Sequence, residues 1–227
     1  MSSHKKAIVL LSGGLDSTTC LAIAVSRGFL VYALSFDYGQ KHKIELEFAM
    51  ENAVRSGAVE HKTAKLDKEF FSVSALTNKN KSVKKDSFGS QKIPDTYVPA
   101  RNTIFLSYAL AYAETVGAET VFIGANSIDY SGYPDCRPEY IYAFQNMANL
   151  ALKDCVENKI RIKIEAPLIS FTKADIIRTG KKLGVDYSKT ISCYDPVGEK
   201  ACGRCESCLL RKKGFEESEC EDETIYV

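Results

Sequence analysis

Long apolar runs are missing from this sequence of 227 residues. No stretch approaches the roughly 20 consecutive apolar residues that a membrane-spanning helix needs. The polar segment 1–6 also lacks the apolar stretch that a secretory signal peptide carries. An excess of either charge is missing too: the formal net charge is +1, so bulk charge indicates no polyanionic partner. We expect a cytoplasmic protein that binds neither membranes nor nucleic acids.

Histidine is scarce, with only His4, His42 and His61 in the chain. All three lie away from the motifs described below, and no set of serine, histidine and aspartate suggests a nucleophilic triad. The sequence also shows no internal repeat. Its length suits one domain, or one domain with a small appended module, and its 45% hydrophobic content is ordinary for a globular protein.

Short apolar runs alternate with segments of helical periodicity along most of the chain. The run 7–11 predicts a strand buried on both faces. Further strands are predicted at 30–36, 62–66, 120–125 and 161–165, and helices at 17–27, 44–55, 103–116, 139–156 and 173–183. Thr172 is the predicted N-cap of the last helix, with Asp175 in the capping-box position. The alternation predicts an α/β fold with a doubly wound, mainly parallel, Rossmann-like sheet.

The segment Ser12-Gly13-Gly14-Leu15-Asp16-Ser17 joins the first strand to the first helix. Glycines let backbone N–H groups approach an anion closely, and a helix N-terminus adds free N–H donors. The segment lacks the lysine of a Walker A motif and the third glycine of the dinucleotide fingerprint. A glycine turn without a ligand is the alternative. We interpret the segment as a loop that grips the phosphates of ATP.

The stretch 77–99 interrupts the alternation with five lysines, two prolines and little apolar content. A solvated loop is the simpler interpretation. A lid that helps to hold phosphates is the other, since long loops in compact domains are often functional.

Four of the eight cysteines lie close together, at Cys193, Cys202, Cys205 and Cys208. Disulfides are disfavoured in reducing cytosol. CxxC spacing lets two thiolates face one ion, and four thiolates without a histidine suit a closed structural zinc site. We expect nearby cations to offset the negative charge of the thiolates. These cations are Lys200, Arg204, Arg211 and Lys212. An iron–sulfur cluster and unligated buried cysteines are the alternatives.

The loop 129–137 follows the strand that ends near Ala125, at a carboxyl end of the predicted sheet. Ligands bind at such ends in open α/β folds. Its tyrosines offer faces for stacking, and its carboxylates can accept the paired N–H donors of a guanine-like base. A structural loop with its tyrosines packed on the core is the alternative.

Five motifs occur in an order that resembles a known family. They are 12–20, 98–102, 129–137, 172–176 and the four-cysteine module. The first resembles the PP-loop of the ATP pyrophosphatase superfamily. The whole set resembles the 7-cyano-7-deazaguanine synthase family of queuosine biosynthesis, from about residue 7 to 215. The resemblance is weakest at 77–94 and in the tail, and Tyr140 stands where the family pattern suggests phenylalanine.

The resemblance implies a fold of the adenine nucleotide alpha hydrolase type and a carbon–nitrogen ligase activity. ATP, ammonia and 7-carboxy-7-deazaguanine would yield 7-cyano-7-deazaguanine through an acyl-adenylate and an amide. A carboxylate is itself an adequate nucleophile toward an α-phosphate, which agrees with the lack of a triad. The resemblance further implies Mg²⁺ with ATP, one structural zinc per chain and a homodimer. Free ammonia is the expected nitrogen source, because no glutamine amidotransferase domain is visible.

The resemblance also implies site residues. ATP is expected to bind Leu11, Ser12, Gly13, Gly14, Leu15, Asp16, Ser17, Thr18, Thr19, Cys20 and Leu21. Asp16 would orient the loop or a magnesium-bound water, while Lys173 and Arg101 would neutralise charge at the phosphates. The substrate would meet Asp129, Tyr130, Tyr133, Asp135 and Arg137. Within that set the carboxylates would read the base edge, a tyrosine would stack, and the arginine would meet the substrate carboxylate or pair with an acid.

Residues 1–190 are therefore predicted to form the ATP-binding α/β domain, with the substrate loop at 126–138. Residues 191–227 would form the zinc module and an acidic tail, packed on the same domain. Two other functions stay open. One is a PP-loop enzyme that acts on tRNA, such as a thiolase using Cys20 or Cys136, or a lysidine synthase. The other is a nucleotide sensor whose zinc knuckle docks a partner.

Overall fold

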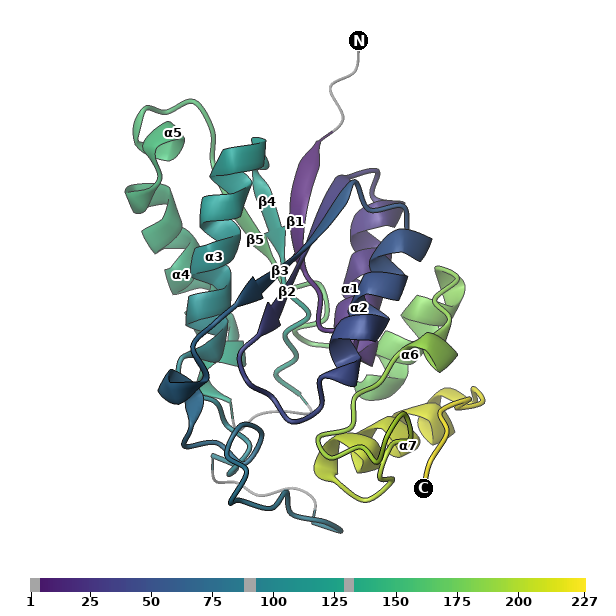
Figure 1. Cartoon of the computed structure of the whole chain (residues 1–227). Coiled ribbons are helices and arrows are strands. Elements are labelled where there is room, and N and C mark those ends of the chain that lie inside the picture. Colours follow the sequence, from purple (N-terminus) through teal and green to yellow (C-terminus); the bar gives the residue numbers. More distant parts are fainter. Residues whose placement is uncertain (1–4, 88–92, 129–132) are drawn as a thin grey trace.

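The computed structural model describes residues 5–87, 93–128 and 133–227. Five parallel strands form one sheet in the order β3-β2-β1-β4-β5 (Figure 1). The strands are β1 (Lys6–Leu10), β2 (Leu30–Asp37), β3 (Glu60–Lys65), β4 (Thr120–Phe122) and β5 (Lys163–Glu165). The order reverses between β1 and β4, a switch point at which open α/β sheets bind ligands. The predicted doubly wound parallel sheet is confirmed.

Helices cover both faces of the sheet. They are α1 (Leu15–Ser26), α2 (Ile44–Arg55), α3 (Arg101–Val116), α4 (Pro138–Ala151), α5 (Lys153–Val156), α6 (Lys173–Lys182) and α7 (Glu206–Ser218). Short 3₁₀ helices occupy η1 (Lys68–Phe71), η2 (Pro134–Cys136) and η3 (Tyr187–Lys189). Figure 1 shows α3 and α4 on one face, α1, α2 and α6 on the other, and α7 beside α6. Within the described residues, no helix is long and apolar enough to cross a membrane.

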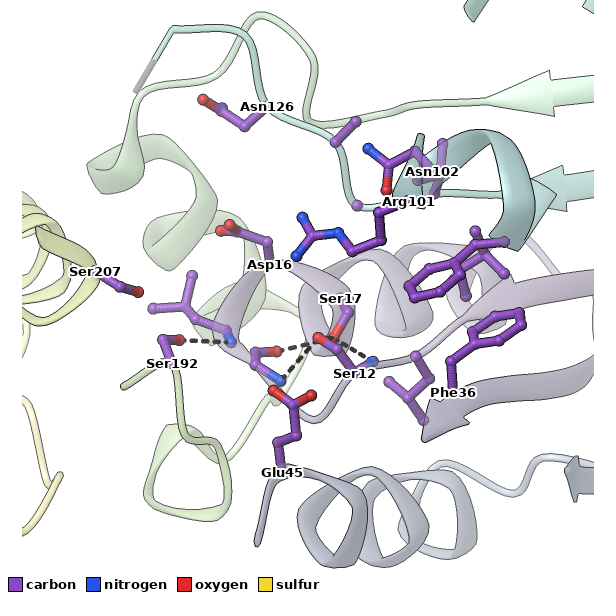
Figure 2. Close-up of a pocket in the computed structure, with 18 of the residues that line it drawn as sticks. Ser12, Asp16, Ser17, Phe36, Glu45, Arg101, Asn102, Asn126, Ser192 and Ser207 are labelled. Atoms are coloured by element: carbon purple, nitrogen blue, oxygen red, sulfur yellow. Dashed lines mark hydrogen bonds between the residues drawn. The ribbon is translucent and has the colours of Figure 1, made fainter. Parts of the chain in front are cut away.

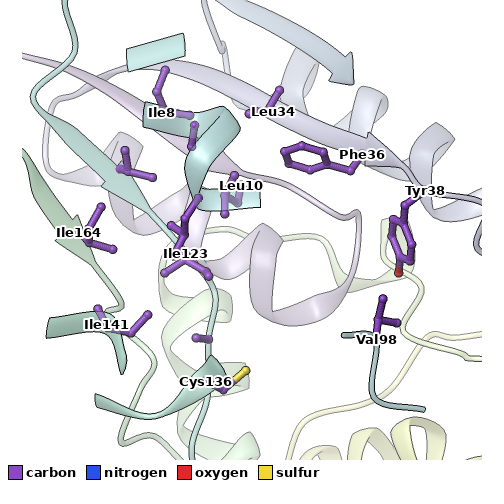
Figure 3. Close-up of a cluster of buried hydrophobic side chains, with 14 of the residues drawn as sticks. Ile8, Leu10, Leu34, Phe36, Tyr38, Val98, Ile123, Cys136, Ile141 and Ile164 are labelled. Carbon is purple, nitrogen blue, oxygen red and sulfur yellow. The ribbon is translucent and has the colours of Figure 1, made fainter. Parts of the chain in front are cut away.

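Alternate residues of β1 enter two separate cores, as the period of a strand requires. Ile8 and Leu10 pack with Leu106 and Ile141 beneath α3 and α4 (Figure 3). Ala7 and Val9 pack into the second cluster, beneath α1 and α6. Burial on both faces explains why β1 reads as a continuous apolar run and not as an alternating one.

Element boundaries differ from the sequence predictions at several points. The single helix predicted over 139–156 is wrong, because Leu152 has an extended backbone (φ −81°, ψ 137°) and separates α4 from α5. The first helix begins at Leu15, so Asp16 and Ser17 already lie in its first turn. The capping box of α6 is confirmed: the Asp175 N–H donates to Thr172 Oγ1, and the Thr172 N–H donates to an Asp175 carboxylate oxygen.

The described part of the lysine-rich stretch lies against the cysteine module. Lys85 forms an antiparallel bridge with Cys205, and the Asp86 N–H donates to the Arg204 carbonyl oxygen at 2.8 Å. The Asp86 carboxylate also accepts from the Arg204 guanidinium. Residues 88–92 lie outside the described ranges. Two segments far apart in sequence thus contact one another, and the Asp86 and Arg204 side chains that join them are exposed.

The chain end is anchored by a buried ion pair. Arg211 is 3% exposed, and its Nε donates to the Asp222 carboxylate at 3.1 Å. Its other nitrogens donate to Thr190 Oγ1 and to the Tyr187 carbonyl oxygen, both at 2.9 Å. The acidic tail predicted from the sequence is therefore packed on the protein at two places. Residues 216–218 complete α7, and the Asp222 carboxylate pairs with Arg211 of α7.

Replacing Asp222 by asparagine should lower the free energy of unfolding by about 3 kcal/mol, because it leaves the Arg211 cation buried without its counter-charge. Urea unfolding followed by circular dichroism would measure the change. Glu221→Gln, at the neighbouring exposed position, is the matched control and should change stability by less than about 0.5 kcal/mol. Equal stability of both variants would contradict the importance of the pair.

Candidate active site

A cavity of about 230 Å³ lies at the carboxyl ends of β1, β2 and β4. It sits at the switch point between β1 and β4, where the fold favours ligand binding. Figure 2 shows side chains entering it from the loop after β1, from α2 and α3, and from the segment before α7. Its lining includes Ser12, Asp16, Glu45, Arg101, Asn126, Tyr133, Lys173 and Ser192.

The loop 12–17 turns tightly against the start of α2. Gly13 has φ +81°, and a Cβ there would lie 2.1 Å from the Glu45 carbonyl oxygen, so only glycine fits. Ser17 Oγ accepts from the Ser12 N–H and donates to the Gly14 carbonyl oxygen, both at 3.1 Å. These bonds hold the loop in shape across the first turn of α1.

Only part of the predicted ATP-binding run lines the cavity. Leu11, Ser12, Gly14, Leu15, Asp16 and Ser17 do so. Thr19, Cys20 and Leu21 are fully buried in α1, and Thr19 Oγ1 bonds to the Leu15 carbonyl oxygen and the Tyr187 hydroxyl. Thr18 Oγ1 is buried and has no hydrogen-bond partner among the described residues. Thr18 does not line the cavity, so an ordered water is the simplest partner for this hydroxyl.

Asp16 and Lys173 form an ion pair at the cavity wall. Lys173 Nζ lies 2.7 Å and 2.9 Å from the two Asp16 carboxylate oxygens, although the residues are far apart in sequence. Lys173 is only 6% exposed. A Cβ on Gly214 would lie 2.4 Å from Lys173 Cγ, so a glycine of α7 makes room for the lysine stem. The module that carries the cysteines thereby helps to position Lys173.

Arg101 enters the same cavity from the first residue of α3. Figure 2 shows its guanidinium on the side where Asp16 lies, and it is 6.0 Å from the centre of the Tyr133 ring. The preceding Ala100 has φ 52°, a left-handed conformation that costs a non-glycine residue energy. The structure thus brings together all three predicted catalytic residues, Asp16, Lys173 and Arg101.

The predicted substrate residues are distributed differently. Tyr133 lines the cavity, and its hydroxyl bonds to Thr96 Oγ1 at 2.8 Å. Asp135 is buried beside α3, where its carboxylate accepts from the Asn102 N–H at 3.0 Å. Arg137 is exposed, and neither it nor Asp135 lines the cavity. Asp129 and Tyr130 lie outside the described residues.

Two buried thiols bear on the tRNA-thiolase alternative. Burial raises the pKa of Cys136 to about 11, and it raises that of Cys20 further. Both thiols are therefore protonated at neutral pH and poor nucleophiles. Neither offers the reactive thiolate that sulfur transfer needs.

Sequence reasoning missed His42 and Glu45. Both line the cavity beside the phosphate loop, and His42 Nε2 lies 3.1 Å from Glu45 Oε2. His42 belongs to none of the five motifs, so it was not predicted as a site residue. One signal was available: residues 38–45 follow the carboxyl end of the second predicted strand, where site residues gather.

The four predicted metal ligands converge. The Sγ atoms of Cys193, Cys202, Cys205 and Cys208 all lie within 4.8 Å of one another. Zinc–sulfur bonds of about 2.3 Å in a tetrahedron require sulfur–sulfur distances of about 3.8 Å, so the cluster fits zinc after small adjustments. Backbone N–H groups of Cys202 and Asp195 point to Cys193 Sγ at 3.2 Å and 3.3 Å, which suits a thiolate.

Of the cations predicted to offset the thiolate charge, Arg204 lies close enough to Cys202 to interact with it electrostatically. Arg204 pairs with Asp86, Arg211 pairs with Asp222, and Lys212 Nζ donates to the Gly203 carbonyl oxygen. Lys85, from the distant lysine-rich stretch, lies beside the cluster and interacts with Cys202 and Asp195.

A family model described as queuosine biosynthesis protein QueC matches residues 6–219. The chain belongs to this family. It is 59% identical over 224 residues to a 7-cyano-7-deazaguanine synthase of Geotalea uraniireducens, covering 98% of this chain and 97% of the relative. It is 58% identical over 224 residues to a 7-cyano-7-deazaguanine synthase of Coxiella burnetii, covering 98% of each. The family resemblance drawn from the five motifs is confirmed.

Solved structures of low identity share the fold. An NMN synthetase from Francisella tularensis has a TM-score of 0.52 at 17% identity, covering 96% of this chain and 79% of that one. A 4-thiouridine synthetase, solved with RNA and bound ATP, has a TM-score of 0.52 at 21% identity, covering 95% of this chain and 50% of that one. At these identities the likeness concerns the fold alone.

Proposed function

We propose that this chain converts 7-carboxy-7-deazaguanine, ammonia and ATP to 7-cyano-7-deazaguanine in queuosine biosynthesis. One observation carries the proposal. The phosphate loop 12–17, Arg101 and Lys173 line the same cavity, at the switch point of the sheet. Its support from relatives is the identity of 59% over nearly the whole chain to a synthase of that name.

The residues suit a reaction in which the substrate itself is the nucleophile. The substrate carboxylate attacks the α-phosphate of ATP, pyrophosphate leaves, and an acyl-adenylate forms. Ammonia then displaces AMP to give the amide. A second ATP activates the amide oxygen in the same way and releases pyrophosphate, and loss of AMP and of both amide N–H protons leaves the nitrile. The protein supplies orientation and charge neutralisation at each step.

Roles within the cavity follow from position and charge. Backbone N–H groups of the loop 12–17 hold the β- and γ-phosphates. Lys173 and Arg101 neutralise the charge that accumulates on the pyrophosphate, and Asp16 holds the Lys173 ammonium in place. Asp16 is the carboxylate of the loop that would help to hold Mg²⁺, and the ion would supply further neutralisation of charge on the ATP phosphates.

Recognition of the deazaguanine involves the segment 126–138. Tyr133 stacks on the base from the cavity wall, while Asp135 acts through Asn102 by holding the first turn of α3, from which Arg101 projects. Asp129 remains a proposed reader of the base edge, and Tyr130 a proposed stacking residue. Arg137, the exposed N-cap residue of α4, stays a proposed partner of the substrate carboxylate or of an acidic side chain.

Five further assignments complete the proposal. Cys193, Cys202, Cys205 and Cys208 hold one structural zinc ion per chain. Residues 1–190 form the ATP-binding unit, and residues 191–227 form a module packed on it. The enzyme works in the cytoplasm as a homodimer.

The test is a reconstitution with purified chain, ATP, Mg²⁺, ammonium and 7-carboxy-7-deazaguanine, with mass detection of amide and nitrile. We expect both products and AMP, and none when ATP or ammonium is omitted. ATP turnover independent of the acid, or tight and salt-sensitive binding of tRNA, would contradict the proposal and favour the tRNA-modifying alternative.

A further inference from the structure

The solvent-facing side of α4 is uncharged over three turns. Residues 142, 143, 146, 147, 150 and 151 are exposed and recur at helical spacing, so they share one face. They are Tyr142, Ala143, Asn146, Met147, Leu150 and Ala151. We call them the α4 patch. Leu150 is 80% exposed and Tyr142 is 67% exposed. Glu139, in the first turn, is the one charged residue of the helix.

α3 lies beside α4 on the same face of the sheet and continues this uncharged surface (Figure 1). Its exposed residues next to the middle of the helix are Ser107, Tyr108 and Ala111. Of its two charged residues, Arg101 lines the active-site cavity, and the Glu114 carboxylate accepts from the Lys153 N–H at 3.1 Å. Thr103 Oγ1 and the Tyr140 hydroxyl lie 2.8 Å apart and join the two helices.

Exposed apolar side chains on α2 have different surroundings. Met50 and Val54 are 56% and 75% exposed, but each is followed directly by a charged residue. These residues, Glu51 and Arg55, pair with one another at 3.6 Å. Apolar side chains scattered among charges are normal at a protein surface, whereas a contiguous apolar patch marks a contact surface. Tyrosine and methionine are enriched and charged residues depleted at the centres of protein interfaces, as they are in the α4 patch.

Charge indicates which partner fits the α4 patch. A nucleic acid would require basic side chains, and α4 has none. In a dimer with a twofold axis the same patch meets itself, so a patch of one charge would repel its own copy and an uncharged one does not. The formal net charge of +1 also gives two whole chains little mutual repulsion. The partner that the patch fits is therefore a second copy of this chain.

We infer that the α4 patch, with the adjoining face of α3, is the surface through which two copies of this chain form a homodimer. The inference names the interface of the homodimer assigned under the proposed function and rests on that assignment alone. Both helices begin beside the cavity: α3 starts with Arg101, and α4 follows directly after the segment that carries Tyr133 and Cys136. Pairing along α3 and α4 thus stabilises the two helices that anchor these cavity residues.

Sedimentation velocity of the full chain tests the surface through Leu150→Glu and Met147→Glu. The wild-type chain should sediment as a dimer at micromolar concentration. Each variant buries one unpaired carboxylate from each copy, so the dissociation constant of the dimer should rise by about 10²-fold or more. Both side chains are exposed in the single chain, so the far-UV circular dichroism spectrum should stay that of the wild type. Val54→Glu on α2 is the matched control and should remain a dimer.

Hydrogen exchange gives a second measure of the same surface. Exchange in α4 should slow as the wild-type concentration rises through the dissociation constant, and it should not depend on concentration in Leu150→Glu. A monomeric wild-type chain would overturn the interface. So would a dimer that both variants leave unchanged, a dimer that Val54→Glu dissociates, or an assembly of more than two copies, because a patch that meets itself closes at two.

Failure of the interface and failure of the proposed reaction are separate results. A monomeric chain that forms the nitrile in the reconstitution assay would overturn the interface and leave the reaction standing. A wild-type dimer that both variants dissociate, but that forms neither amide nor nitrile, would overturn the reaction and leave the interface standing.

Discussion

Replacing Lys173 by methionine should lower AMP formation by about 10³-fold, the cost of removing one preorganised charge from a phosphoryl-transfer site. Lys173 Nζ contacts both Asp16 oxygens at the wall of the cavity, within the reach of phosphates held by the loop 12–17. Methionine keeps the length and the apolar stem, so packing against Gly214 is preserved. Single-turnover AMP formation from ATP, ammonium and the deazaguanine acid would measure the effect.

Two further variants define what Lys173 does. Lys182→Met, on the exposed side of α6, should retain wild-type activity. Asp16→Ala should also abolish AMP formation, since it releases Lys173 from its fixed position. If Asp16→Ala turned over near the normal rate, Asp16 would have no part in the site. If Lys173→Met lost stability and activity in equal measure, the ion pair would be structural and the assignment of Lys173 to the phosphates would be wrong.

Replacing Cys205 by serine should remove the bound metal and lower the melting temperature by about 10 °C or more, because metal binding and folding of such a module are coupled. Cys205 is fully buried among the other three thiols. Metal analysis of the wild-type chain should find one zinc ion and no sulfide. Iron and sulfide in protein purified without oxygen would refute zinc and support a cluster.

Enzyme activity should fall when the metal is lost, because the cysteine module contacts the active site at two points. Ser192 Oγ, next to the ligand Cys193, accepts from the Leu15 N–H of the phosphate loop at 3.3 Å. Gly214 of α7 packs on Lys173. Cys220→Ser, at a half-buried cysteine beyond α7, is the matched control and should keep its metal. Retention of full activity by the metal-free Cys205→Ser chain would contradict this coupling.

Local sequence determined the parts of the site that are continuous in the chain. The strand 6–10, the loop 12–17 and the helix that follows are adjacent, so glycine content and apolar periodicity sufficed to predict an anion-binding turn. The CxxC spacing likewise brings ligands together over one tight turn, at Gly203 with φ +69°. The capping box of α6 depends on two residues three positions apart, and it too was predicted.

Tertiary structure alone decided how these parts meet. The Asp16–Lys173 pair, the contact of Lys85 with the cysteine module and the role of Asp135 beside Asn102 each join residues of different elements. His42 belongs to no motif, and only the parallel alignment of β2 beside β1 carries it and Glu45 to the phosphate loop. Such contacts depend on the order of the strands and on the packing of helices against them, which hydrophobic periodicity does not encode. The sequence by itself predicted a phosphate loop and a four-cysteine cluster that fits a metal ion, whereas the strand order and helix packing decided which charged side chains surround them.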